Sequence, residues 1–375
     1  MAGWSKHADM KRNAGLVAIL WCFSQAASGG ALAEQITAAS QKNFGEYLEL
    51  LSIANVADQP RDIQRNAAFL EQSFRKRGFK VHLLNNAAQR PLVLAELTGT
   101  GKNQPTVLFY MHFDGQPVTP EQWSQKSPFE PVVKRRGADG GWEEVSRERV
   151  LAKPFDPELR VFARSASDDK APIMMLLTAI DVLKGRAPAI NVKVLLDSEE
   201  EISSPSLAET VQANRALFDA DALVVLDGPV HGPGRPTLVY GNRGITQALL
   251  TVFGPKAPLH SGHFGNYVPN PAQRLASLLA SMKDDEGRVL VPGYYDGIEL
   301  TAADGDVLKA TGDDEAALLK RAGIARAERV GENYQEALQF PWLNVRGRVS
   351  AAVGAKAANI VPSEAVAEID IRTTP

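Results

Sequence analysis

The 375-residue chain has almost no cysteine: Cys22 is the only one. A single thiol cannot form an internal disulfide bond, and it cannot supply the thiolate set of a structural zinc site. Cys22 also lies in an N-terminal segment that we expect to be removed from the mature protein. Disulfides, thiolate metal sites and a cysteine nucleophile are therefore excluded.

The sequence also lacks an excess of positive charge. Its 41 Lys and Arg residues face 44 Asp and Glu residues, which gives a formal net charge of -3. Nothing therefore favours a nucleic acid or an anionic membrane surface as partner, and a small molecule or peptide is the expected ligand. The composition, 44% hydrophobic and 23% charged, is that of a globular protein long enough for two or three domains.

The first 33 residues have the layout of a secretory signal. Three basic residues, Lys6, Lys11 and Arg12, precede an apolar run over residues 14–23 and then small residues that end at Ala33. The apolar run is shorter than the ~20 residues that a membrane-spanning helix needs. We therefore predict a signal peptide over residues 1–33, cut near Ala33, a secreted or periplasmic mature protein, and no membrane attachment after cleavage.

Two domains are expected after this segment. In residues 34–242, a helical pattern (44–78) and an apolar helix (171–183) alternate with strand-like runs at 81–84, 92–97, 106–111, 192–196 and 222–226. This alternation predicts an α/β domain with a mostly parallel sheet flanked by helices. In residues 243–375, strand-like runs at 245–253 and 365–372 enclose helical patterns at 272–282 and 313–329, which predicts a second, α+β domain.

Four groups of histidine and carboxylate residues follow predicted strands or precede a predicted helix. They are His112 with Asp114, Asp168 with Asp169, the acidic run of residues 197–201, and Asp227. Each alone has an ordinary explanation, such as a helix N-cap or a solvated charge run. Together they lie where open α/β sheets bind ligands, and their side chains suit zinc, cobalt or manganese.

These segments resemble, in order, the metal-site motifs of the M20 family of metallopeptidases, most closely its carnosinase-type dipeptidases. The matching segments are His112-Phe-Asp114-Gly-Gln-Pro117, residues 163–172 (ARSASDDKAP), Glu199-Glu200-Glu201-Ile-Ser-Ser-Pro205, and Asp227. The resemblance implies a zinc-peptidase-like catalytic domain and two divalent metal ions, zinc first, with cobalt or manganese as alternatives. It assigns His112, Asp168, Glu201 and Asp227 as metal ligands, with Asp168 bridging the two ions.

The resemblance also implies how the reaction proceeds. Glu200 would be the general base that activates water for peptide hydrolysis, and Asp114 would orient His112. The second domain resembles the family's inserted lid and dimerisation domain, which implies a homodimer. In that domain His260 would stabilise the oxyanion in the partner subunit's site, while Arg372 and Asn359 would bind the substrate, Arg372 by gripping its carboxylate.

The sequence departs from the family's pattern in two respects. After His263 there is no further histidine, so the family's last metal ligand is missing, and we expect the chain to be a fragment of a longer protein or a truncated form. In addition, Ala163, Ser165, Ala171 and Ser203 stand where the family usually has glycine, which permits backbone angles that are costly for other residues.

Three functions remain compatible with these residues. The first is hydrolysis of dipeptides or short peptides, and the second is removal of an N-acyl group from an amino acid by the same chemistry. The third, from a different class, is an inactive truncated relative that binds peptides or dimerises. The presence of both Glu200 and Glu201 favours an enzyme, whereas the missing histidine favours a binding protein.

Overall fold

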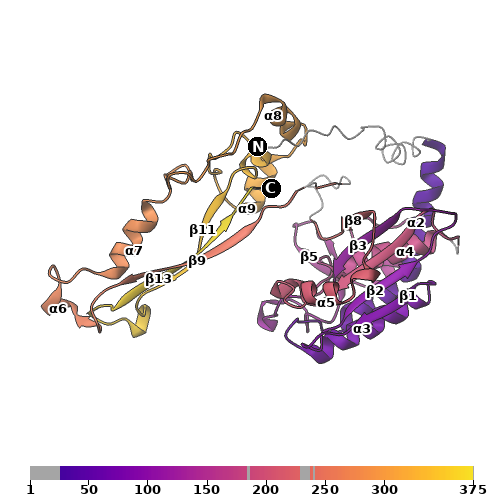
Figure 1. Cartoon of the computed structure of the whole chain (residues 1–375), viewed down its shortest axis with the longest axis horizontal. Helices are drawn as coiled ribbons and strands as arrows, with labels where there is room; N and C mark the ends of the chain where they lie inside the picture. The colour runs from indigo at the N-terminus through magenta and orange to yellow at the C-terminus, as the bar shows by residue number, and fades with distance from the viewer. Residues whose placement is uncertain (1–25, 184–185, 229–236, 240, 375) are drawn as a thin grey trace, which may run out of the picture. The chain divides into compact units, whose positions relative to one another are not determined.

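The computed structural model describes residues 26–183, 186–228, 237–239 and 241–374, which form two compact units, divided in the sequence after Gly228 (Figure 1). Most of the predicted signal segment, including Cys22, lies outside the described residues. No helix in the described ranges is long and apolar enough to cross a membrane.

A five-stranded sheet forms the centre of the first unit, in the order β1-β2-β7-β3-β8. The strands are β1 (Lys80–Leu84), β2 (Leu92–Leu97), β3 (Thr106–His112), β7 (Asn191–Asp197) and β8 (Ala222–Val225). Strands β7, β3 and β8 are parallel, whereas β2 is antiparallel to both of its neighbours. The expected mostly parallel sheet is therefore mixed, because residues 85–91 are too few for the crossover that would make β1 and β2 parallel.

Helices cover both faces of this sheet. Side chains of α2 (Ala26–Ser52), α3 (Pro60–Arg75) and α4 (Lys170–Val182) pack on one face around Phe74, Met111 and Leu196. Side chains of α5 (Leu207–Ala213) and η4 (Arg215–Leu217) pack on the other face, against Leu94 and Leu195. The alternation of buried side chains along β2 supplies both layers.

The helical pattern predicted over residues 44–78 is two helices, not one. Helix α2 ends at Ser52, and α3 begins at Pro60, which occupies its first turn. The residue before a proline is pushed away from helical angles, so a break at this point is expected. Gly78, with φ +87°, follows the end of α3 as predicted.

Residues 132–162 contain a small antiparallel sheet that no pattern in the sequence predicts. It has the order β5-β4-β6, with β4 (Val132–Arg136), β5 (Trp142–Val145) and β6 (Arg160–Phe162), and the short helices η1 (Pro120–Gln122) and η2 (Arg147–Leu151) lie nearby in sequence. Its strands are three to five residues long and rich in charge, so they give no periodic apolar signal.

The second unit contains an antiparallel sheet in the order β11-β13-β9. Strands β9 (Ile245–Phe253), β11 (Trp342–Val349) and β13 (Glu364–Arg372) are covered by α7 (Pro271–Ala280), whose Leu275 packs on Ala365 and Ala367. Two short strands, β10 (Leu259–His260) and β12 (Ile360–Val361), form a separate pair. The remaining helices are α6 (Ser261–Phe264), α8 (Ala302–Lys309), α9 (Glu315–Ala322), α10 (Tyr334–Ala337) and η5 (Gly354–Lys356).

The charged helix expected over residues 313–329 is shorter than predicted. Helix α9 stops at Ala322, where Gly323 adopts a left-handed conformation with φ +68°. Glycine is the usual residue at such a helix end, so the stop has a local cause that the charge pattern concealed.

Candidate metal centre

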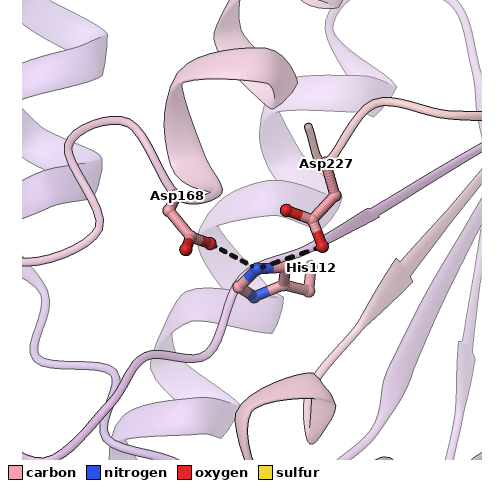
Figure 2. Close-up of side chains that lie close together, drawn as sticks. All are labelled: His112, Asp168 and Asp227. Atoms are coloured by element: carbon pink, nitrogen blue, oxygen red, sulfur yellow. Dashed lines mark hydrogen bonds and ion pairs between the residues drawn. The ribbon is translucent and has the colours of Figure 1, made fainter. Parts of the chain in front are cut away.

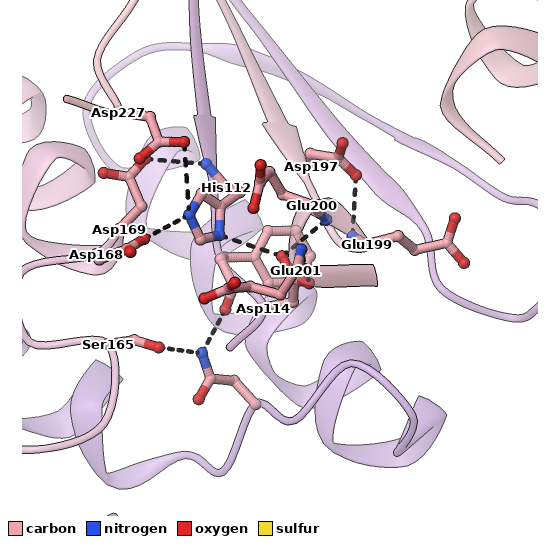
Figure 3. Close-up of polar contacts among 12 residues, drawn as sticks. His112, Asp114, Ser165, Asp168, Asp169, Asp197, Glu199, Glu200, Glu201 and Asp227 are labelled. Atoms are coloured by element: carbon pink, nitrogen blue, oxygen red, sulfur yellow. Dashed lines mark hydrogen bonds and ion pairs between the residues drawn. The ribbon is translucent and has the colours of Figure 1, made fainter. Parts of the chain in front are cut away.

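The predicted site residues of the first unit converge on one edge of the five-stranded sheet. Strand β3 ends at His112, β7 ends at Asp197, and Asp227 follows shortly after β8. Because these strands are parallel, their carboxyl ends meet at the same edge. Asp168 and Asp169 directly precede α4 and join them, as do Glu200 and Glu201 of η3 (Glu200–Ile202) (Figure 3).

Three of the four predicted metal ligands form a close group. The Nε2 atom of His112 lies 2.7 Å from Oδ1 of Asp168 and 3.9 Å from Oδ2 of Asp227 (Figure 2). One ligand atom from each residue lies within 4.8 Å of the others. An imidazole nitrogen with two carboxylate oxygens is a donor set that zinc, cobalt and manganese accept, so these residues fit a divalent cation.

The fourth predicted ligand, Glu201, lies in the same region but outside this group. Its Oε2 accepts a hydrogen bond from Nε2 of Gln116 at 2.6 Å. Its neighbour Glu200, the predicted general base, is likewise half-buried in this region (Figure 3). The structure therefore gathers His112, Asp168 and Asp227 in one group, with both glutamates of η3 close by.

Asp114 connects the histidine to the glutamates. Its fully buried carboxylate lies 3.2 Å from Nδ1 of His112, on the opposite side of the ring from Asp168. The same carboxylate accepts hydrogen bonds from the backbone N–H groups of Glu200 (3.2 Å) and Glu201 (3.0 Å). The Asp114 side chain thus orients the His112 ring and fixes the backbone of η3. The contact with the His112 ring was expected from the sequence, whereas the contacts with the η3 backbone were not.

The concentration of carboxylates shifts the pKa of several groups. Burial alone would lower the pKa of His112, but the hydrogen bond to Asp114 and the charges of Asp114, Asp169 and Asp227 raise it to about 10. Burial raises the pKa of Asp169 to about 8, and it also raises the pKa of Glu200 and of Asp227. Without a cation the imidazole holds a proton, which it must release to act as a ligand.

Two buried residues beside the trio were not singled out as functional. Asp169, 1% exposed, accepts a hydrogen bond from the backbone N–H of His112 at 3.1 Å. Lys170 is fully buried, and its Nζ donates to the carbonyl oxygens of Leu50 (2.9 Å) and Ile53 (3.0 Å) at the end of α2. Burial lowers the pKa of Lys170 well below its usual value. Asp169 could have been found from the sequence, because it forms an adjacent pair with Asp168. No pattern in the sequence indicates the hydrogen-bond acceptors of Lys170.

Two of the four positions that lack glycine have the backbone angles that favour it. Ser165 has φ +59° and Ser203 has φ +70°, whereas Ala163 and Ala171 have no positive φ. The cost of the positive φ at Ser165 is partly offset, because the Oγ of this residue accepts a hydrogen bond from Nδ2 of the buried Asn55 at 2.9 Å. Ser203 ends η3 directly after Glu201 and Ile202, so the strained backbone lies beside the acidic residues.

In the second unit, two of the three predicted residues lie together. His260 ends β10 and Asn359 directly precedes β12, the strand with which β10 pairs, and the carbonyl oxygen of Asn359 accepts a hydrogen bond from Ser261 N at 2.9 Å. Nδ1 of the exposed His260 accepts a hydrogen bond from the N–H of Gly262 at 3.1 Å. Arg372 lies on the other sheet, at the end of β13, with 44% of its side chain exposed and Nε 3.8 Å from Asp370.

Comparisons with known proteins identify peptidases as relatives. The family model of a peptidase dimerisation domain, M20_dimer, matches residues 240–375. The Cys-Gly metallodipeptidase dug1 of Schizosaccharomyces pombe is 28% identical over 338 residues, which cover 86% of this chain and 66% of that protein. The Beta-Ala-His dipeptidase of Mus musculus is 27% identical, over 76% of this chain and 54% of its own length. The chain therefore spans less than two thirds of the length of these curated relatives.

Solved structures show the same fold. The M20 family metallo-carboxypeptidase Sso-CP2 of Sulfolobus solfataricus is 29% identical, with a TM-score of 0.70 over 89% of this chain and 71% of that one. Human carnosine dipeptidase 1 has a TM-score of 0.70 at 23% identity, over 92% of this chain and 72% of that one. A metallodipeptidase and a metallo-carboxypeptidase are thus among the relatives in the two comparisons. Residues 240–375 thus match the M20 dimerisation domain, and the chain is similar to metallopeptidases of the M20 family.

Proposed function

We propose that the protein hydrolyses the peptide bond of dipeptides or short peptides by a metal-dependent mechanism. The observation that carries this proposal is the His112–Asp168–Asp227 trio with Glu200 beside it at the carboxyl edge of the sheet. The dipeptidases among its relatives support dipeptides as the substrate class. Removal of an N-acyl group would use the same residues, so only turnover of both substrate classes distinguishes the two reactions.

Four residues would hold two divalent ions: His112 and Asp227 on one, Glu201 on the other, and Asp168 between them. Zinc is the first candidate, and cobalt or manganese would suit the same donors. Bound there, such ions supply Lewis acidity that polarises the scissile carbonyl and acidifies a water molecule. Asp114 keeps Nε2 of His112 directed at Asp168 and Asp227 by holding the opposite ring nitrogen.

Glu200 would move the proton. Burial raises the pKa of its carboxyl, and a base whose pKa is closer to the working pH transfers protons more effectively. It would take a proton from the attacking water and pass it to the leaving amine. The hydrogen bond from its own backbone N–H to Asp114 keeps the carboxyl at this edge of the sheet.

The second unit would supply the contacts to the substrate. Nδ1 of His260 accepts a hydrogen bond, so in the neutral ring Nε2 carries the hydrogen and can donate to a developing oxyanion. Arg372 presents an exposed guanidinium that can hold a substrate carboxylate with two hydrogen bonds, with Asn359 as a second polar contact. We propose this unit, residues 243–375, as the lid and dimerisation domain, with residues 34–242 as the catalytic domain.

A homodimer through this domain is also proposed. Among the described residues, β9 pairs only with β13, so its other edge is open, and Leu249 and Phe253 on this strand are 68% and 79% exposed. An open strand edge with apolar side chains is suited to pairing with another chain. We further propose that residues 1–33 direct secretion or export to the periplasm, on the strength of their basic, apolar and small-residue segments.

The test combines metal content with turnover. We expect two divalent ions per chain and hydrolysis of dipeptides ahead of N-acetyl amino acids. The variant Glu200→Gln should keep its metal and lose about 10²- to 10⁴-fold in kcat, because the proton acceptor is removed. Glu209→Gln, on the exposed surface of α5, is the matched control and should retain full activity. A metal-free wild type without turnover would leave only a peptide-binding or dimerising protein.

A further inference from the structure

Three consecutive glutamates follow β7, and their carboxyl groups are chemically equivalent. Glu199, Glu200 and Glu201 follow Asp197, the residue of β7 that pairs with His112 of β3, and a carboxylate of any of them is able to bind a divalent cation. The structure treats them differently: Glu199 is fully buried, whereas Glu200 and Glu201 are half-buried. Some feature of the fold must therefore select which two carboxylates face the centre.

The carboxylate of Glu199 is fully engaged away from the trio. Its Oε1 accepts a hydrogen bond from Nη1 of Arg90 at 2.8 Å, and its Oε2 accepts one from the backbone N–H of Ser206 at 3.0 Å. Its backbone is also fixed, because its N–H donates to Asp197 at 2.9 Å and its carbonyl oxygen accepts from Ser204 at 2.7 Å. Figure 3 shows the side chain of Glu199 directed away from His112.

Arg90 is itself held in place at the end of the loop between β1 and β2. Its backbone N–H donates to Oδ1 of Asn86 at 3.0 Å, and its carbonyl oxygen accepts from Nδ2 of Asn86 at 2.6 Å. The same carbonyl accepts from Oγ of Ser198 at 2.8 Å, so the arginine contacts the acidic segment through its backbone and its guanidinium. With 18% of the side chain exposed, the ion pair to Glu199 is largely shielded from water.

We infer that Arg90 is a positioning residue: by pairing with Glu199 it fixes the acidic segment so that Glu200 and Glu201, and not Glu199, face the His112 centre. The inference rests on the proposed metal-dependent function. Its physical basis is the cost of a buried carboxylate without a partner. If Arg90 is removed, Glu199 must find another cation or be hydrated. Either change rotates the segment and displaces both neighbouring glutamates.

Three variants separate this effect from a general loss of stability. Arg90→Met removes the guanidinium and leaves Glu199 unpaired, Glu199→Met leaves Arg90 unpaired, and the double variant removes the charged pair at similar volume. Replacing both members of a buried pair by apolar residues is often neutral, whereas removing one is costly. Arg65→Met, which removes an exposed arginine of α3 that pairs with Asp62, is the matched control.

Zinc affinity of the folded chain, measured by competition with a chromophoric chelator well below the melting temperature, is the first readout. We expect Arg90→Met to weaken zinc binding at least tenfold and to lower kcat more than it changes KM. The zinc affinity of the double variant should be within about threefold of the wild-type affinity, and Arg65→Met should bind zinc as wild type does. An Arg90→Met protein with wild-type affinity, or a double variant as impaired as the single one, would overturn the inference.

Amide hydrogen exchange of residues 197–206 in the metal-free chain gives a readout that needs neither zinc nor activity. Arg90→Met should speed exchange at Glu200 and Glu201, whose N–H groups bond to Asp114, and the double variant should restore protection. Unchanged exchange in Arg90→Met refutes the positioning role. A wild type that binds no zinc would contradict the proposed function alone, since exchange still decides the role of Arg90.

Discussion

The two units differ in how their candidate functional residues are held. In the first unit, His112, Asp114 and Asp169 are buried and linked by hydrogen bonds to one another and to η3. In the second unit, His260 is exposed and Arg372 has 44% of its side chain exposed, with its carboxylate neighbour at 3.8 Å. A preorganised group suits a cation that stays in place, whereas exposed donors suit a ligand that comes and goes.

Substitution of Asp168 in the first unit should have the largest effect on metal content and activity. Asp168→Ala removes the carboxylate 2.7 Å from His112, and the proposed bridge between two ions is lost. We expect loss of at least one bound metal per chain and at least a ~10³-fold decrease in kcat/KM. Metal analysis together with dipeptide turnover measures both effects. Retention of two ions and activity would show that the ligand assignment is wrong.

Substitution of Arg372 should have a smaller effect of a different kind. Arg372→Met removes the guanidinium proposed to bind the substrate carboxylate, at the cost of one exposed contact with Asp370. KM for dipeptides should rise about 10- to 100-fold, with metal content and stability unchanged. Arg346→Met, which lies on β11 and is also exposed, is the control. An equal rise in KM for both variants would remove the substrate role from Arg372.

Acid should remove the stabilising contribution of one carboxylate of the first unit, Glu46. Glu46, 12% exposed, is hydrogen-bonded to Arg77, Lys76 and Ser73; burial raises its pKa, but these contacts outweigh burial and lower it from 4.5 to about 2. The resulting stability is present above pH 4.5 and is lost as the pH falls toward 2. Every described ion pair of the second unit includes a side chain at least 44% exposed, so these pairs contribute little to its stability.

Urea unfolding of wild type and Glu46→Gln between pH 2 and pH 6 tests this difference. Above pH 4.5 the wild type should be more stable by at most about 3 kcal/mol, and the two proteins should converge toward pH 2. Glu328→Gln in the second unit is the control and should show no such pH-dependent difference. A constant difference at all pH values would mean that Glu46 acts through packing rather than through its charge.

The smallest effect concerns two helix ends with the same backbone angle. Ser203 (φ +70°) ends η3 in the first unit, and Gly323 (φ +68°) ends α9 in the second. Because glycine adopts this conformation without strain, Ser203→Gly should stabilise the protein by about 0.5 kcal/mol, and Gly323→Ser should destabilise it by about 1 kcal/mol. Thermal melting of both variants measures the shifts, and changes of the same sign would contradict the strain argument.

The sequence predicted the framework of the fold better than its connections. Strands at 92–97 and 245–253 were correct to the residue because their apolar runs are strong. The small sheet of β4, β5 and β6 was missed because its strands are short and charged. The single helical pattern predicted over residues 44–78 was wrong at Pro60, where α3 begins as a separate helix after α2.

For the candidate site, the sequence indicated the residues that end strands but not those that support them. His112 and Asp227 lie at the ends of apolar runs, so their convergence follows from parallel pairing. Arg90 and Asn55 reach the site through tertiary contacts between loops distant in the chain. Nothing in their local sequence marks such contacts, and only the folded chain brings them together.

Lys170 offers a chemical reporter of the link between the N-terminal helix and this edge of the sheet. Lys170 lies two residues after Asp168 in the chain. Its amine is fully buried and donates hydrogen bonds to the carbonyl oxygens of Leu50 and Ile53. An amine-directed labelling reagent should therefore leave Lys170 unmodified as long as α2 stays docked. Cleavage or displacement of α2 would expose the amine, and covalent labelling would then record detachment of that helix by mass spectrometry.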